Sequence, residues 1–326
     1  MTAMPELRDR FVGSLLGATC GDVLGAAVEM WSRDEIRATF GLLRDFQPHT
    51  RGFGRYTDDT EMSLALTRSL CACGGADAGD CARRYAATFT PGRGYGRSAV
   101  QILSALGEGR EYWQTATLLF PEGSYGNGAA MRIAPVGLLY GRGTEAGLRE
   151  AVDAAVCCTH VHLEAVEAAC LQAVAVGLLL EGSPGRDFTV DDLLGPLQRS
   201  CRCPMLGRAL TSVAHLLATA ADGDAVLERF GCGVRSADSW PPALWAALRY
   251  QHDPEAALIE AVNLGGDADT IGAMTGALVG ALHGTNWIPS RWFENLENGV
   301  NGRDEIIRAA GLLADLALSG HPEVQV

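Results

Sequence analysis

The chain has 326 residues, a hydrophobic fraction of 48% and a formal net charge of −13. This length permits a sizeable core, and the apolar content is too high for a disordered protein. Charged residues interrupt the apolar stretches, which argues against a membrane protein, and the acidic balance argues against binding to a nucleic-acid backbone. A small phosphate-bearing ligand stays compatible, because it needs only local donors.

Ten cysteines raise the question of disulfides or zinc. No regular disulfide framework is visible, and no pair has the Cys-x-x-Cys spacing of zinc sites. We interpret most of them as small buried apolar residues in a reducing compartment. The stretch Arg10–Glu29 resembles a signal peptide, but Asp22 interrupts it and the helical pattern continues. We therefore expect a cytoplasmic protein.

Apolar residues recur with helical spacing along the chain, whereas alternating strand patterns are scarce. Many segments are rich in Ala and Leu, with Gly or Pro between them. We predict an all-α protein with a single domain over residues 1–326, because no long low-complexity linker divides it. The predicted helices cover Leu7–Ala27, Thr60–Cys73, Ala78–Phe89, Gly128–Tyr140, Glu145–Cys158, Glu164–Leu180, Leu206–Ala220, Pro241–Tyr250, Pro254–Val262, Thr270–Leu282 and Glu305–Leu318.

Two of these helices carry a glycine every four residues. The two sets are Gly13, Gly17, Gly21 and Gly25, and Gly272, Gly276, Gly280 and Gly284. A glycine inside a helix costs on the order of 1 kcal/mol relative to alanine, so four on one face need a reason. A glycine ridge lets another backbone approach closely. We infer that both helices are central and face each other, with chance composition as the alternative.

Thr57, Asp58 and Asp59 stand together before an apolar helical pattern, in the stretch RYTDDTEMSLAL. One Thr or Asp at a helix start accepts backbone N–H bonds and complements the helix dipole. Three successive oxygen-bearing residues exceed the needs of a cap, and Glu61 adds another charge. Close carboxylates repel one another unless they are protonated or share a cation. For this cluster alone, capping and metal binding both stay open.

A second cluster, Asp267, Asp269 and Thr270, follows two glycines that let the backbone turn tightly. Facing ridges would also bring Glu29, at the end of the first helix, next to this cluster. The two clusters offer six candidate oxygen ligands before Glu29 is counted. Hard cations such as Mg²⁺ and Mn²⁺ prefer such oxygens. We therefore predict a site for two divalent metal ions, with Mg²⁺ favoured and Mn²⁺ as the alternative.

The stretch Glu122–Tyr140, EGSYGNGAAMRIAPVGLLY, joins a glycine-rich loop to an apolar helix. Its glycines allow positive φ and exposed N–H groups, and its polar residues add donors. Such a loop before a helix suits an anionic phosphate, although it lacks the Gly-Lys-Ser/Thr signature of a P-loop. A turn with an aromatic anchor is the alternative. A second flexible loop of this type is PGRGYG, Pro91–Gly96.

Five motifs occur in the order seen in the ADP-ribosylglycohydrolases, the group that includes dinitrogenase reductase-activating glycohydrolase. They are GSLLGATCGDVLGAAVE, YTDDTEMSLAL, GSYGNGAAMR, THVHLEA and GGDADTIGAMTGALVGA. They run from Gly13 to Ala281, so the chain resembles this family over nearly its whole length. The resemblance implies a single compact, orthogonal multi-helix domain with a binuclear Mg²⁺ or Mn²⁺ centre.

The resemblance also assigns roles to the residues that match the motifs. The ligands of one metal correspond to Thr57, Asp58 and Asp59, and those of the other to Asp267, Asp269 and Thr270. Asp269 corresponds to the bridge between them, and Glu29 to a mobile glutamate that contacts a metal or gates the substrate. The candidate catalytic carboxylates are Glu29, Asp58, Asp59 and Asp269, and which of them is the general base stays open.

The substrate-binding residues follow from the same resemblance. The diphosphate-binding loop corresponds to Gly123, Ser124, Tyr125, Gly126 and Asn127, with Gly94 beside it. His160 corresponds to a histidine that contacts the distal ribose or a phosphate, with capping or packing as its alternative. Phe120 corresponds to an aromatic on the adenine side.

The implied activity is metal-dependent hydrolysis of the C1″ bond of ADP-ribosyl groups, with release of ADP-ribose. The combination of RGYG and GSYGNGAAMR resembles the branch that acts on O-linked ADP-ribose: ADP-ribosyl-serine, poly(ADP-ribose) and O-acetyl-ADP-ribose. Arginine-linked ADP-ribose, a non-catalytic ADP-ribose-binding module and a two-metal phosphoesterase are the alternatives. The expected partner is an ADP-ribosylated protein or a small ADP-ribose derivative, and we expect a monomer.

Overall fold

The computed structural model describes residues 6–182 and 190–319. Apart from two isolated bridges, these residues contain no β structure, so the all-α prediction is confirmed. The predicted helices that the structure contains, with their observed bounds, are α1 (Leu7–Gly25), α3 (Asp58–Cys73), α4 (Ala78–Thr88), α8 (Glu145–Val156), α9 (Leu163–Glu181), α11 (Pro204–Ala218), α13 (Ser236–Arg249), α14 (Pro254–Asn263), α15 (Ala268–His283) and α17 (Arg303–Leu318).

The predicted helix Gly128–Tyr140 is wrong as one element, because the chain forms α6 (Gly128–Met131) and α7 (Ala134–Tyr140). Pro135, in the first turn of α7, has no N–H to continue the ladder from α6. Several short helices were not predicted, because most of them lack long Ala- and Leu-rich runs. These are α2 (Arg33–Phe40), α5 (Arg97–Gly107), η1 (Tyr112–Gln114), α10 (Val190–Ser200), α12 (Gly223–Phe230) and α16 (Ser290–Phe293).

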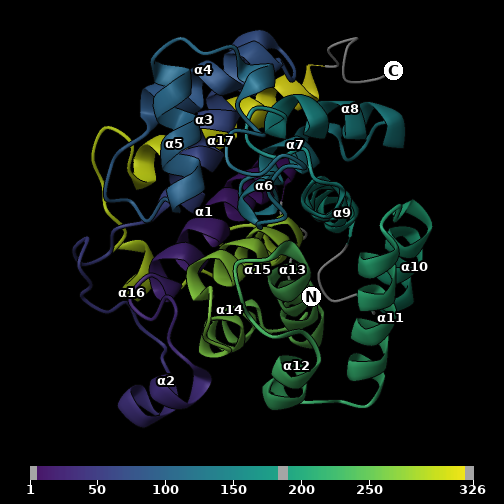
Figure 1. Ribbon diagram of the computed structural model, residues 1–326. Helices are drawn as coiled ribbons and strands as arrows, with labels where there is room; N and C mark the ends of the chain where they lie inside the picture. The colour runs from purple at the N-terminus through teal and green to yellow at the C-terminus, as the bar shows by residue number, and fades with distance from the viewer. Residues whose placement is uncertain (1–5, 183–189, 320–326) are drawn as a thin grey trace.

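Helices α1 and α15 lie side by side at the centre of the fold, and their glycine ridges face each other (Figure 1). A Cβ atom added at Gly17 would lie 2.4 Å from the carbonyl oxygen of Gly276. One added at Gly21 would lie 2.1 Å from the carbonyl oxygen of Gly272. Any side chain at these positions would force the two backbones apart, so the glycines set the distance between the helices.

The remaining helices pack around this pair in several directions and share its hydrophobic core (Figure 1). Helix α9 is long and apolar enough to cross a membrane by length and composition alone, yet 78% of its most apolar window is buried against other helices. This burial is typical of a core helix in a large protein, which can be apolar on all sides. All ten cysteines are free thiols, and only Cys73 is exposed.

Candidate functional site

The close approach of α1 and α15 places Glu29 next to the second aspartate cluster. A Cβ atom at Gly25 would lie 2.3 Å from the backbone nitrogen of Asp269. The chain leaves α1 directly after Gly25, and a carboxylate oxygen of Glu29 lies within 4.8 Å of oxygens from Asp267 and Asp269. The structure thus brings together residues that are more than two hundred positions apart.

The first cluster is held by Asp22, a fully buried residue of α1. Its carboxylate accepts the backbone N–H of Thr57 at 2.9 Å, the backbone N–H of Thr60 at 3.1 Å and the hydroxyl of Thr60 at 2.6 Å. The two N–H groups belong to the N-cap residue and the first turn of α3, where backbone N–H groups have no partner within the helix. The hydroxyl of Thr57 accepts the backbone N–H of Asp59 at 3.4 Å, and Asp22 completes the cap of α3 from another helix. The carboxylates of Asp58 and Asp59 are therefore not needed for capping.

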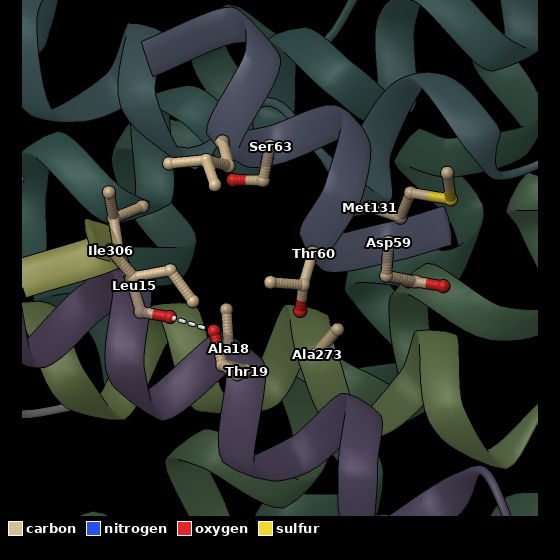
Figure 2. A pocket seen from close by; sticks show the side chains of 10 residues that line it. Leu15, Ala18, Thr19, Asp59, Thr60, Ser63, Met131, Ala273 and Ile306 are labelled. Carbon is tan, nitrogen blue, oxygen red and sulfur yellow. Dashed lines mark hydrogen bonds between the residues drawn. The ribbon is translucent and has the colours of Figure 1, made fainter. Parts of the chain in front are cut away.

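Hydrogen bonds join the two clusters at Asp59. The hydroxyl groups of Thr57 and Thr270 donate to its Oδ2 atom at 3.1 and 3.2 Å. The other oxygen, Oδ1, is buried and has no hydrogen-bond partner among the described residues. A small cavity of about 10 Å³ lies between α1 and α3. Figure 2 shows that the carboxyl group of Asp59 points away from the centre of this cavity.

The carboxyl groups of the combined cluster cannot all ionise easily in this arrangement. Burial, followed by the charge of Asp22, raises the pKa of Asp58 to about 8. Burial and neighbouring carboxylates raise the pKa values of Asp59 and Asp269 well above the usual range. Burial also raises the pKa of Asp267. Buried carboxylates of this kind are stable in the ionised form only with a counter-charge.

The donor set fits hard divalent cations. Three carboxylate oxygens, from Glu29, Asp267 and Asp269, lie within 4.8 Å of one another. Asp59, which Thr270 joins to this group, adds the unpartnered oxygen Oδ1. The hydroxyl groups of Thr57 and Thr270 add neutral oxygens next to Asp59. An all-oxygen set favours Mg²⁺ or Mn²⁺ over zinc.

Arg51 is a cation in contact with this cluster, and no sequence pattern predicted it. Its guanidinium pairs with Glu29 at 2.7 Å, and both side chains are largely buried. Gly94, with φ +106°, lies against the same guanidinium: a Cβ atom there would lie 2.9 Å from Arg51 and 3.1 Å from Oδ1 of Asp58. Gly94 therefore sits beside the carboxylates, where only a glycine leaves room for Arg51.

A cavity of about 400 Å³ opens over the carboxylates and is lined by nearly all of the predicted site residues. Its wall includes the loop after Gly123, which adopts a φ of +82°. The backbone N–H groups of Ser124 and Tyr125 have no partner in the described part of the chain and stay available to a ligand. These groups suit a phosphate, as the sequence pattern predicts.

Asn127 differs from the expectation of a free phosphate donor. Both N–H bonds of its amide are used, one toward Asp267 at 2.5 Å and one toward Ser239 at 3.0 Å. Its backbone N–H donates to the carbonyl of Val234 at 3.0 Å. In this structure Asn127 positions Asp267 and joins the loop to the carboxylate cluster.

The mouth of the cavity carries two exposed aromatic residues. Phe120 is 47% exposed and Tyr125 is 53% exposed, and both line the cavity together with Val234. The guanidinium of Arg235 lies 5.2 Å from the centroid of the Tyr125 ring. The aromatic residues provide flat surfaces on which a base can stack. Val234 and Arg235 were not predicted, because they come from a loop far along the chain.

Two histidines of the THVHLEA motif have different roles. His160 lines the cavity, and its Nδ1 atom lies 2.8 Å from the hydroxyl of Thr159. Removal from water, with a contribution from the charge of Arg132, lowers the pKa of His160 to about 3, so it is neutral at physiological pH. His162 is the cap of α9 and accepts the backbone N–H of Glu164 at 3.2 Å.

A helical fold with paired aspartate clusters beneath a glycine-rich loop defines the ADP-ribosylglycohydrolase class. A sequence profile described as ADP-ribosylglycohydrolase matches residues 3–322, and the chain belongs to this family.

Individual relatives are similar to this chain along most of their length. The human protein named ADP-ribosylhydrolase ARH3 is 31% identical, with 88% of this chain and 89% of the relative covered. The ADP-ribosyl-(dinitrogen reductase) glycohydrolase of Rhodospirillum rubrum is 33% identical, with 97% and 98% covered. A solved structure titled ADP-ribosylglycohydrolase-related protein complex aligns with a TM-score of 0.77 and 29% identity, over 96% of this chain and 99% of that one.

Proposed function

We propose that this protein hydrolyses the C1″ glycosidic bond of ADP-ribosyl groups and releases ADP-ribose. The observation that carries the proposal is the joining of the two carboxylate clusters through Asp59 and Thr270, directly beneath a cavity with free N–H groups and exposed aromatic residues. Such a cavity matches an ADP-ribosyl group, which combines a diphosphate with a base and a ribose diol.

The same proposal includes a binuclear metal centre, with Mg²⁺ favoured over Mn²⁺. One ion would be held by Thr57, Asp58 and Asp59, and the other by Asp267 and Thr270, with Asp269 between them and Glu29 at the edge. Bound divalent cations supply positive charge that neutralises these carboxylates and orients the hydroxyl groups of the distal ribose. The unpartnered Oδ1 atom of Asp59 supports this assignment.

The chain's own residues orient the substrate and handle protons. The N–H groups of Ser124 and Tyr125 hold the diphosphate, and the rings of Tyr125 and Phe120 flank the base. Glu29 and Asp58 line the cavity and keep partial exposure, whereas Asp59 and Asp269 are buried. We therefore assign proton transfer at the departing atom to the carboxyl group of Glu29 or Asp58.

We place the enzyme with the branch that acts on O-linked ADP-ribose, because the human relative matches over 88% of the chain and the RGYG and GSYGNGAAMR motifs agree. A hydrolase of arginine-linked ADP-ribose is the second candidate. The observation that favours it is the 33% identity to the Rhodospirillum rubrum glycohydrolase over 97% of the chain.

Product analysis by mass spectrometry tests both. The protein is incubated with Mg²⁺ or Mn²⁺ and with ADP-ribosyl-serine peptide, ADP-ribosyl-arginine peptide or O-acetyl-ADP-ribose, each with an EDTA control. Metal-dependent release of ADP-ribose from the serine peptide or the acetyl ester is the expected result. Release from the arginine peptide alone would move the enzyme to the second candidate. AMP as the product would show attack on the diphosphate, and binding without any product would indicate a recognition module.

A further inference from the structure

Arg132 is a buried cation on the wall of the large cavity. Its side chain is 1% exposed, and in the described part of the chain its guanidinium donates only to neutral groups. The two shortest bonds, both at 2.6 Å, go to the carbonyl oxygen of Gly128 and the hydroxyl oxygen of Thr159. The guanidinium also lies 4.7 Å from the ring centroid of Tyr85. A buried charge is costly unless it is well paired, so the position of Arg132 needs a reason.

Thr159 links Arg132 to His160. Its hydroxyl oxygen accepts a hydrogen bond from Nη2 of Arg132 at 2.6 Å and lies 2.8 Å from Nδ1 of His160. The hydroxyl group has one proton and two candidate acceptors, Nδ1 of His160 and the carbonyl oxygen of Val156 at 3.1 Å. This carbonyl already accepts the backbone N–H groups of Thr159 at 2.9 Å and His160 at 2.8 Å, so both of its lone pairs are in use. The hydroxyl proton therefore goes to Nδ1 of His160.

The charge of Arg132 favours the same direction of this bond. An Nδ1–H group on His160 would point its positive end toward the cation, whereas an unprotonated Nδ1 presents a lone pair on that side. A hydroxyl group that accepts from a cation is also polarised into a stronger donor. Removal from water, followed by the charge of Arg132, lowers the pKa of His160 to about 3, so the ring takes up no second proton at neutral pH. The neutral ring therefore carries its one proton on Nε2.

The Nε2 atom of His160 lies beside the glycine-rich loop. A Cβ atom at Gly126 would lie 3.9 Å from Nε2, and one at Gly128 would lie 3.4 Å from it. The hydrogen bond at Nδ1 is the only one that the ring makes with the described residues, so Nε2 stays open to a ligand. The ring lines the same cavity as Ser124 and Tyr125, whose backbone N–H groups are available. A proton on Nε2 adds a third donor at a place that suits phosphate.

We propose that Arg132 and Thr159 are positioning residues that hold the neutral ring of His160 with its proton on Nε2, so that the ring donates to an oxygen of the ligand's diphosphate. This inference rests on the proposed function, which supplies the diphosphate. The cation acts through the hydroxyl group and the hydroxyl group through Nδ1, so neither Arg132 nor Thr159 has to contact the ligand. With the opposite tautomer, the lone pair of Nε2 would face the diphosphate and repel it.

Nuclear magnetic resonance of the protein with isotope-labelled histidine nitrogens shows the tautomer directly, because protonated and unprotonated ring nitrogens have distinct chemical shifts. The chain has seven histidines, and comparison with His160→Gln assigns the signals of His160. The wild-type protein without ligand, at neutral pH, should carry the proton of this ring on Nε2. A proton on Nδ1 would overturn the proposal.

Thr159→Val removes the hydroxyl group and keeps the shape of the side chain. The Nδ1 resonance of His160 should move toward that of a nitrogen without a hydrogen bond, and the affinity for ADP-ribose in the presence of Mg²⁺ should fall about fivefold in calorimetric titration, because the ring is no longer held. Thr159→Ser should restore both values. Thr67→Val is the matched control, because the hydroxyl of Thr67 is also buried and bonds to a carbonyl, that of Ser63, but does not line the cavity. An unchanged resonance and affinity in Thr159→Val would overturn the proposal.

Arg132→Met tests the cation. The Nδ1 resonance of His160 should move in the same direction as in Thr159→Val but by less, because the hydroxyl group stays and only its polarisation is lost. If this variant does not fold, Arg132→Lys decides. Lysine keeps the charge but lacks the fork that reaches both Gly128 and Thr159, so part of the shift should remain. An unchanged resonance in the folded variant would remove Arg132 from the proposal.

The two measurements separate this inference from the proposed function. A wild-type protein that binds ADP-ribose with the His160 proton on Nδ1 would overturn the inference and leave the proposed function intact. Failure of the wild-type protein to bind ADP-ribose would overturn the proposed function, and with it the role of His160 as a donor to the diphosphate.

Discussion

The starts of α3 and α15 carry similar residues, but their backbone donors are satisfied differently. At α3, Asp22 of α1 accepts the N–H groups of Thr57 and Thr60. At α15, Asp267 occupies the capping position and makes no capping bond, because its carboxylate bonds to Asn127 instead. In neither helix are the local carboxylates consumed by capping.

Ordinary caps elsewhere in the chain sharpen this contrast. Asp253 accepts the N–H of Ala256 at 3.0 Å, and Asp222 accepts the N–H of Ala225 at 3.1 Å. Each of these aspartates makes the capping bond of its own helix. The two clusters therefore contain buried carboxylates that capping does not use, and this arrangement is typical of a cation site.

The largest expected effect comes from Asp269→Asn. Removing this charge from between the two clusters should lower turnover on the order of a thousandfold while the fold survives, because the loss concerns the reacting centre. Asp253→Asn is the matched control and should keep full activity, since asparagine also caps well. Steady-state kinetics and circular dichroism check both variants, and full turnover by Asp269→Asn would refute its bridging position.

The next largest effect concerns the facing glycines that set the distance between α1 and α15. Gly21→Ala should lower the free energy of unfolding by about 3 kcal/mol, because its Cβ would meet the backbone of Gly272 at 2.1 Å. Gly107→Ala in α5 is the control, because nothing lies within 4 Å of its Cβ position. Denaturant unfolding measures both, and equal stability of the two variants would contradict the close packing of α1 on α15.

Asp22→Asn should disturb the start of α3 and leave the start of α15 unchanged. Both carboxylate oxygens of Asp22 accept hydrogen bonds, whereas the amide of asparagine has only one oxygen. The free energy of unfolding should therefore fall by about 1–3 kcal/mol. Misplacement of Asp58 and Asp59 should also reduce kcat more than it raises KM. Unfolding curves and steady-state kinetics give both values. An Asp22→Asn protein with wild-type stability and kcat would show that the Thr57 hydroxyl caps α3 without help from Asp22.

The last prediction is a pH dependence of stability in the cation-free protein. The pKa of Asp58 rises from 3.8 to about 8 on folding, so between these values the folded state binds more protons than the unfolded chain. Stability should therefore fall as pH rises through this window, and Mg²⁺ should restore it. Asp58→Asn should show a shallower decline in thermal unfolding profiles. An identical slope in the variant would contradict the assignment.

The sequence predicts the central helices and the residues of both clusters for a clear reason. Glycines every four residues on α1 and α15 have one steric use, and the Thr-Asp-Asp and Asp-x-Asp-Thr groups exceed what capping needs. The break before Pro135 was not predicted, although it follows from the missing N–H of this proline, and the short helices were missed because most lack long Ala- and Leu-rich runs.

Other parts of the site depend on packing that no spacing reveals. Asp22 appears in the sequence as one charge in an apolar helix, and only the approach of α3 gives it a capping role. Arg51 comes from a loop, and its partner Glu29 is 22 residues away. The side-chain amide of Asn127 donates to Asp267, at the start of α15, and not into the predicted phosphate site.

A titration of the metal-free protein with Mn²⁺, followed by calorimetry and by electron paramagnetic resonance, shows whether the two carboxylate clusters form one cation site. We expect two ions per chain with magnetically coupled signals, and loss of the coupling in both Asp59→Asn and Asp269→Asn. A wild-type protein that binds no Mn²⁺, or one whose binding is unchanged in both variants, would show that the two clusters do not form a common cation site.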